Sequence, residues 1–177
     1  MIIEQPIRTP RLELRSLAPG DANETYLAWL HDPEVNQYLE IRHDPPGLES
    51  LSSFIKQMNE SKQELLLGIC VKDGSHVGNI KLGPIDSGDH RAAIGILIGD
   101  RAWWGKGVAT EAIEALTQYA FEELSLHRVE AGCYESNIGS ARAFEKAGWS
   151  IEGRRKHRRA TLHGWEDEIL MGCVRPG

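Results

Sequence analysis

Residues 103–112 read Trp-Trp-Gly-Lys-Gly-Val-Ala-Thr-Glu-Ala and join a strand-like stretch to a strongly helical one. Glycines at 105 and 107 let the backbone approach a ligand closely, because they carry no side chain. The first N–H groups of a helix have no partner within it, so the helix that starts near Val108 directs them toward the same point. Phosphate is the usual occupant of such an arrangement. We therefore expect a strand–turn–helix unit that binds a phosphate-bearing molecule.

The spacing of apolar residues predicts the elements around this unit. Apolar alternation and turn signals predict strands over 11–15, 65–71, 77–82, 92–98, 128–134 and 169–174, of which the second to fourth pair consecutively and antiparallel. Helical spacing predicts helices over 22–30, 33–39, 48–58, 108–124 and 138–147. The inward residues of the helix over 48–58 are expected to be Leu51, Phe54, Ile55 and Met58. These elements predict one α+β domain over residues 1–177 with a central mixed sheet.

Composition excludes several classes of protein. A net charge of −6 argues against nucleic acid as the main partner. No apolar stretch approaches the length of a membrane span, so no membrane partner is expected. Cys70, Cys133 and Cys173 lie far apart, which is typical of a reduced, cytoplasmic protein. The histidines form no pair with ligand spacing, so we expect no metal.

The glycine turn by itself does not identify the ligand. It lacks the Gly-x-x-x-x-Gly-Lys-Ser/Thr of phosphate-transfer loops and the Gly-x-Gly-x-x-Gly of dinucleotide sites. A second motif follows the next predicted strand, with Asn-Ile-Gly-Ser at 137–140 and Phe-Glu-Lys-Ala-Gly-Trp at 144–149. Together the two motifs resemble the acetyl-CoA-binding motifs of the GNAT superfamily of N-acetyltransferases.

The resemblance extends over nearly the whole chain. In that family a Gln/Arg-x-x-Gly-x-Gly/Ala segment binds the CoA pyrophosphate, and the matching segment here, 104–109, has Trp104 in place of Gln/Arg. Segments 8–12 and 29–35 resemble the Rim-like branch, which includes ribosomal-protein, spermidine and amino-sugar acetyltransferases. The resemblance implies a three-layer α+β fold whose mostly antiparallel sheet, of about seven strands flanked by helices, splays in the middle for CoA.

The resemblance also implies where acetyl-CoA binds. The backbone amides of residues 105–110 would hold the pyrophosphate, pantetheine would lie against the backbone of Ile96 and Ile98, and the Leu97 N–H would stabilise the oxyanion. Asn137, Ser140 and Phe144 share one helix face, with Asn137 on the pantetheine arm and Ser140 near the sulfur. The expected cofactor-binding residues are Ile96, Leu97, Ile98, Trp104, Gly105, Lys106, Gly107, Val108, Ala109, Thr110, Asn137, Ser140 and Phe144.

The resemblance and the residues leave several candidates for the general acid and the general base. Many relatives carry a tyrosine at the Phe144 position that returns a proton to the leaving thiolate, so here Ser140, a bound water or Tyr134 would take that role. The general base would be Glu135, Glu152, Asp167 or His90, and positioning of the amine could replace a dedicated base. The catalytic set predicted from the sequence is Ser140, Tyr134 and Glu135. Cys133 is expected to pack as a small apolar residue, which favours direct attack in a ternary complex over an acetyl-cysteine.

The sequence leaves the acceptor open. We expect a primary amine on a small molecule, such as an amino sugar or nucleotide amino sugar, or on a protein N-terminus. Helices of the N-terminal third and the loop at 43–47 would bind it. The basic run at 154–159 predicts a solvated hairpin loop or a contact with an anionic ligand. The C-terminal strands are expected to form the interface of a homodimer, and a non-catalytic CoA-binding sensor or scaffold is the alternative function.

Overall fold

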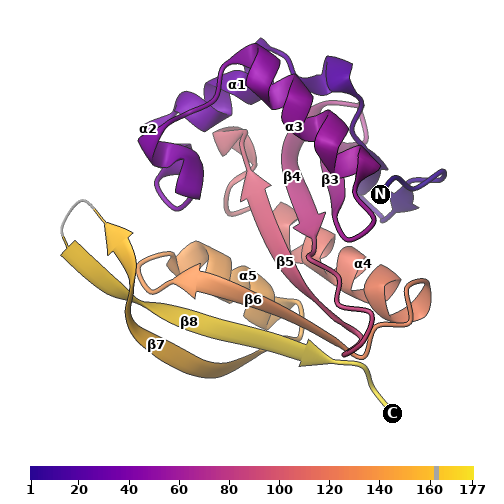
Figure 1. The fold of residues 1–177 in the computed structure, drawn as a ribbon, viewed down its shortest axis with the longest axis vertical. Helices are drawn as coiled ribbons and strands as arrows, with labels where there is room; N and C mark the ends of the chain where they lie inside the picture. The colour runs from indigo at the N-terminus through magenta and orange to yellow at the C-terminus, as the bar shows by residue number, and fades with distance from the viewer. Residues whose placement is uncertain (162–163) are drawn as a thin grey trace.

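A computed structural model describes residues 1–161 and 164–177 and contains one open sheet flanked by helices (Figure 1). The strands are β1 (Ile7–Arg8), β2 (Leu12–Ser16), β3 (Leu65–Val71), β4 (His76–Leu82), β5 (Arg91–Ile98), β6 (Arg128–Tyr134), β7 (Ser150–Thr161) and β8 (Gly164–Val174). The α-helices are α1 (Glu24–His31), α2 (Pro33–Asn36), α3 (Leu48–Glu60), α4 (Val108–Glu122) and α5 (Ile138–Lys146). Short 3₁₀ turns are η1 (Pro19–Asp21), η2 (Glu40–His43) and η3 (Arg101–Trp103).

The sheet has the strand order β1-β2-β3-β4-β5-β6-β8-β7. Every neighbouring pair is antiparallel except β5 and β6. This confirms a mixed, mostly antiparallel sheet, with eight strands instead of about seven because β1 and β7 also join it. That residues 1–177 form one domain stays a prediction.

The two faces of the sheet carry separate hydrophobic clusters. Alternate residues of a strand point to opposite faces, so Leu65 and Leu67 of β3 join the cluster under α4, whereas Leu66 joins the cluster under α1 and α3. On α3, Leu51 and Ile55 are buried and Met58 packs beside them. Phe54 is 38% exposed, so its predicted inward position is wrong. The stripe of α3 that contacts the sheet is narrower than the apolar spacing suggested.

The sheet separates between β5 and β6. These parallel strands pair only at Arg91–Arg128, Ala92–Val129 and Ala93–Glu130, and beyond these pairs the two strands have no ladder. Figure 1 shows β6, β8 and β7 running away from β5 at a wide angle from a common base. The splay implied by the resemblance is therefore present, and it leaves unpaired backbone along the last residues of β5.

The basic run at 154–159 lies within β7, so its assignment to a hairpin loop is wrong. Arg154 pairs with Ile169 and Arg155 with Glu168, and after an irregular register Arg159 pairs with Glu166. Acidic side chains on the neighbouring strand offset the basic ones, because cross-strand neighbours of opposite charge attract. Arg155 and Arg159 both contact the buried carboxylate of Glu168. None of the helices in the described parts of the chain is long and apolar enough to cross a membrane.

Candidate functional site

A cleft of about 580 Å³ opens where β5 and β6 separate. Most residues predicted to bind a phosphate-bearing ligand line it: Ile96, Leu97, Ile98, Trp104, Gly105, Gly107, Val108, Ala109, Thr110, Asn137 and Ser140. Lys106 and Phe144, which were also predicted, are not among its lining residues. Segments from β5, the glycine turn, α4 and α5 thus meet around one space.

The glycine turn has the geometry of an anion site. Gly105 and Gly107 have φ of 70° and 79°, in the left-handed region where a side chain is strained. Gly107 is the N-cap of α4, and the Glu111 N–H is the first to reach a helical carbonyl, that of Gly107, at 3.1 Å. The N–H groups of residues 108–110 therefore have no helical acceptor and lie at the cleft. These donors and the helix dipole favour a negatively charged group.

Two side chains hold this turn in place. Arg11 donates from Nη1 to the Lys106 carbonyl at 2.8 Å and forms an ion pair with Glu111 at 2.6 Å. Trp104 donates from its indole Nε1 to the Ile98 carbonyl at 2.8 Å. The Lys106 Nζ lies 5.3 Å from the centre of the Trp103 ring. Trp104 thus ties the turn to the end of β5, a role that its place in the sequence motif did not indicate.

The backbone of β5 presents alternate residues to the cleft. The Gly83 N–H donates to the Ala93 carbonyl and the Gly99 N–H to the Val77 carbonyl, so the odd-numbered residues of this strand hydrogen-bond toward β4. Residues 94, 96 and 98 consequently direct their N–H and carbonyl groups toward the splay. The Leu97 N–H faces Asn79 of β4, which corrects its assignment as an oxyanion donor. The Ile98 N–H is the corresponding donor on the cleft side.

The N-terminus of α5 forms the opposite wall. Asn137 caps this helix, with its side-chain Oδ1 accepting from the Ser140 N–H at 3.1 Å, so its amide Nδ2 is the group left to bind a ligand. The Ser140 hydroxyl lies 3.4 Å from the Cys133 sulfur. Burial raises the pKa of the Cys133 thiol, so the thiol stays protonated and is a poor nucleophile.

The side chain of Phe144, a residue of α5, is buried outside the cleft. It is 2% exposed, and its ring centre lies 4.7 Å from that of Trp149. The Trp149 indole in turn donates to the Thr117 hydroxyl of α4 at 3.2 Å. The expectation that Phe144 shares a ligand-binding face with Asn137 and Ser140 is wrong. One turn beyond Ser140, the Phe144 side chain points into the core and not into the cleft. Ala143 lines the cleft in its stead.

The other predicted catalytic residues lie outside the cleft lining. Glu135 forms an ion pair with Arg154, and Glu152 with Arg128. The Asp167 carboxylate accepts from the His157 N–H at 3.0 Å, and His90 lies in the turn before β5. Tyr134 is buried with its ring against that of Tyr38, which does line the cleft.

Several side chains at the cleft have contacts that the two sequence motifs did not indicate. Ser136 donates to Glu166 Oε1 at 3.0 Å and lies 3.4 Å from the Tyr38 hydroxyl, so it links β8 to the segment after α2. Glu34 is the one carboxylate among the described lining residues, and it pairs with Arg101 at 2.5 Å. Arg142 and Lys146 of α5 add positive charge. Only the folded chain brings these residues together, because they come from four separate segments.

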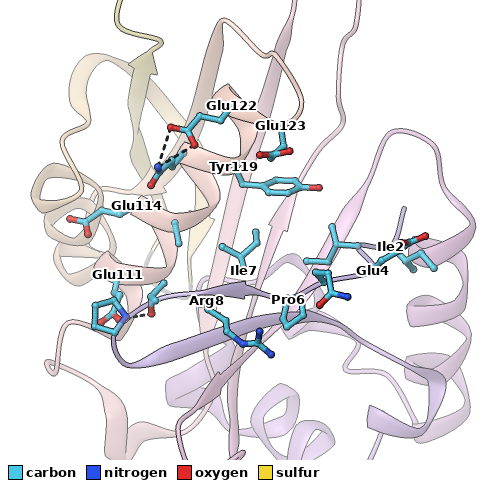
Figure 2. Close-up of a pocket in the computed structure, with 16 residues that line it drawn as sticks. Ile2, Glu4, Pro6, Ile7, Arg8, Glu111, Glu114, Tyr119, Glu122 and Glu123 are labelled. Carbon is cyan, nitrogen blue, oxygen red and sulfur yellow. Dashed lines mark hydrogen bonds between the residues drawn. The ribbon is translucent and has the colours of Figure 1, made fainter.

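A larger cavity of about 760 Å³ lies on the outer side of α4, against residues 2–10 (Figure 2). Its glutamates, Glu4, Glu111, Glu114, Glu122 and Glu123, make it acidic. Glu111 is held by Thr9 and Arg11, and Glu122 by Gln118. This acidic cavity shares no lining residue with the cleft between β5 and β6, and the described residues around the cavity include no cysteine, serine or histidine. The splayed cleft is therefore the better candidate for group-transfer chemistry.

Comparison with known proteins agrees with this choice. The family model "Acetyltransferase (GNAT) domain" matches residues 11–150. The chain is 38% identical over 120 residues to the "Probable N-acetyltransferase YjcK" of Bacillus subtilis, which covers 66% of this chain and 65% of that protein. It is 31% identical over 164 residues to the spermidine N(1)-acetyltransferase of Escherichia coli K12, covering 93% and 81% of the two chains.

The fold is also similar to solved structures. A GNAT-family acetyltransferase from Bacillus anthracis superimposes with a TM-score of 0.82 at 26% identity, over 96% of this chain and 98% of that one. In the described parts of this chain, no group of three or more His, Cys, Asp or Glu residues could hold a metal ion.

Proposed function

The chain belongs to the GNAT family of acetyl-CoA-dependent N-acetyltransferases, and we propose that it transfers the acetyl group by direct attack of a primary amine within a ternary complex. The observation that carries this proposal is the cleft itself. It combines the unpaired N–H groups at the N-terminus of α4 with unpaired backbone along β5. The first suits a pyrophosphate and the second suits an extended amide chain.

The residues of the cleft fit acetyl-CoA. Residues 108–110 would donate backbone N–H groups to the pyrophosphate, with Arg142 and Lys146 adding positive charge. Pantetheine carries two amides, and the N–H and carbonyl groups of Ile96 would pair with them as with an added strand. The Asn137 Nδ2 would bind the same arm from the other wall.

Replacing Trp104 with phenylalanine is expected to raise the KM for acetyl-CoA about fivefold. The ring is kept, but the indole hydrogen bond to the Ile98 carbonyl is lost, and one such bond contributes about 1 kcal/mol. The turn would then be held less firmly over the pyrophosphate. Trp165→Phe, at a tryptophan that is 65% exposed, is the control. An unchanged KM in Trp104→Phe would show that the turn does not depend on this bond.

The chemistry consists of one acyl transfer. The amine nitrogen attacks the thioester carbonyl carbon, the carbon–nitrogen bond forms, and the carbon–sulfur bond breaks to release CoA thiolate. The Ile98 N–H would stabilise the oxyanion. Ser140 and the N-terminus of α5 would stabilise the thiolate, which takes up the proton that the amine loses. The protonated, buried Cys133 supports direct attack over a covalent acetyl-enzyme.

We do not assign the general base to Glu135, because its carboxylate pairs with Arg154 outside the cleft lining. Ser136 connects another acidic group, Glu166 of β8, to the cleft. A protonated amine must lose one proton before it attacks, and a water between Ser136 and the amine would carry that proton toward Glu166, whereas the second proton goes to the thiolate. Most of the rate would come from holding the amine against the thioester, since positioning alone supplies a large part of such barriers.

A thiol-release assay with acetyl-CoA and a panel of amines tests the proposed function. The panel should contain polyamines, amino sugars, peptides with an unblocked N-terminus and amino acids. We expect release of CoA that depends on the acceptor. Tight CoA binding without turnover of any acceptor would favour the alternative, a non-catalytic CoA-binding sensor. The burial of Phe144 weakens that alternative, because the position that suggested it lies outside the cleft.

We also propose a homodimer through the C-terminal strands. β7 forms an edge of the sheet, and Ile151 and Trp165 on this hairpin are 51% and 65% exposed. Light scattering after size-exclusion chromatography measures the mass in solution, and a mass of one chain at micromolar concentration would contradict the proposal.

A further inference from the structure

A cluster of arginines surrounds Tyr134 at the end of β6. Alternate residues of this strand point to opposite faces, and Cys133 contacts Ser140 on the α5 side. Tyr134 therefore points to the face covered by α1 and α2, where its ring centre lies 5.3 Å from that of Tyr38. Since Tyr38 also lines the cleft, the cluster lies beside the acetyl-CoA cleft, on the side away from α4 and α5.

Two guanidinium groups lie over the Tyr134 ring, one from η2 and one from β7. The carbon atoms at their centres are 5.6 Å (Arg42) and 5.1 Å (Arg159) from the ring centre. Arg42 donates to the carbonyls of Leu39 and Ala160, at 2.7 and 2.8 Å. No carboxylate in the described residues lies within 4 Å of the Arg42 side-chain nitrogens. Its positive charge is therefore not offset by an ion pair.

The other charges of the cluster do not restore the balance. Arg155 and Arg159 share the buried carboxylate of Glu168, and Glu40 lies 3.7 Å from Arg159. The Arg159 Nε is buried and finds no hydrogen-bond partner among the residues that the structure describes. Two of the three guanidinium groups thus contact carboxylates, and one of these carboxylates, Glu40, is 90% exposed. Glu166, which lies opposite Arg159 in the sheet register, accepts a hydrogen bond from Ser136. Among the described residues, Arg42 is therefore the guanidinium of this cluster that has no ion pair.

The floor next to the cluster is open at Gly95. Gly95 of β5 and Gly132 of β6 lie on the same face as Leu97 and Tyr134, and both are exposed although they belong to central strands. A Cβ built on Gly132 would lie 2.6 Å from Glu168 Oε1, so the Glu168 carboxylate bounds the floor on the side of β8. A Cβ built on Gly95 would meet nothing within 4 Å. A ligand on this face could therefore reach the splay between β5 and β6 without displacing a side chain at Gly95.

From these observations we infer that the acceptor amine carries an anionic group, a carboxylate or a phosphate, which Arg42 and Arg159 bind beside Tyr134. Guanidinium groups are always charged and bind such anions through paired hydrogen bonds. The amine of the same molecule would extend over the glycine floor toward the thioester. This inference rests on the proposed acetyl transfer, and it disfavours polyamines, which carry only positive charge.

Matched pairs of acceptors test the inference. Alanine is compared with alaninamide, and glucosamine 6-phosphate with glucosamine, so that one pair probes a carboxylate and the other a phosphate. We expect kcat/KM to be at least about tenfold higher for the anionic member of one pair, because hydrogen bonds between charged groups are stronger than those between neutral ones. The pair that shows the preference identifies the anion. Equal kcat/KM values within both pairs would overturn the inference.

Substitutions then separate recognition from a structural role. In Arg42→Gln the preference for the anionic acceptor should fall about tenfold, with the neutral acceptor little affected, and Arg42→Lys should keep part of it. Arg159→Gln should act in the same direction. Arg158→Gln is the control, because this neighbouring arginine is exposed and forms no ion pair within the described residues. Equal losses for anionic and neutral acceptors in Arg42→Gln would mean that Arg42 only holds η2 to β7, and would overturn the inference.

The two proposals fail in different ways. If neutral amines are acetylated as well as anionic ones, the inference is wrong and the acetyl transfer stands. If acetyl-CoA binds and no amine of either kind is acetylated, the proposed function is wrong, and the inference falls with it.

Discussion

Replacing Ser140 with alanine is expected to lower kcat about a hundredfold and to leave the KM for acetyl-CoA within about twofold. Removing a single donor that stabilises developing negative charge typically costs this much. Ser140 is the residue of α5 that has a hydroxyl and lines the cleft, and it lies in the first turn of the helix. The negative charge on sulfur develops only as the carbon–sulfur bond breaks, so the loss should appear in kcat.

Cys133→Ala is the matched control, because its sulfur lies only 3.4 Å from the Ser140 hydroxyl. This variant should keep kcat within about threefold of the parent if the amine attacks the thioester directly. Single-turnover measurements of CoA release, made alongside steady-state rates, ensure that the chemical step is compared. Full activity in Ser140→Ala would remove this residue from the mechanism. Loss of activity in Cys133→Ala, with a trapped acetyl-enzyme in the parent, would replace direct attack by a covalent route.

The parts of the fold that depend on local sequence were predictable. The residues Val108, Ala112, Leu116 and Ala120 repeat every four positions, and all four are buried against the sheet. The glycine turn was also predictable from local sequence. Its conformation depends on the glycines themselves, and the helix N-terminus must follow directly.

The orientation of individual groups was not predictable, because it depends on contacts between distant segments. Whether the Leu97 or the Ile98 N–H faces the cleft depends on the register of β5 with β4, which a strand-like pattern does not contain. Phe144 turns inward because Trp149 and Thr117 provide a place for it. The basic run became a strand because β8 supplies acidic partners from the other side of the hairpin. The arginine cluster at Tyr134 likewise needs η2 and β7 to meet.

Replacing Gly99 with alanine is expected to destabilise the fold by about 3 kcal/mol, a factor of more than a hundred in the unfolding equilibrium. Gly99 follows β5 directly, and a Cβ there would overlap the Trp29 ring at three of its atoms. The ring has no room to retreat, because its centre lies 5.6 Å from that of Tyr26 and 5.1 Å from that of His76. Trp29 is 7% exposed and belongs to the cluster under α1 and α3, so moving it would disturb the packing of the whole acceptor side.

Urea denaturation of Gly99→Ala and Gly95→Ala measures this effect against a matched control. Both glycines belong to the same segment, but a Cβ at Gly95 meets nothing within 4 Å, so Gly95→Ala should change the free energy of unfolding by less than about 1 kcal/mol. Gly95→Ala should still lower the kcat/KM for the acceptor, because the added methyl group raises the floor over which the amine approaches. Equal stability of the two variants would mean that Trp29 can shift without cost. In that case the close packing of Trp29 on Gly99 would contribute little to the stability of the acceptor side.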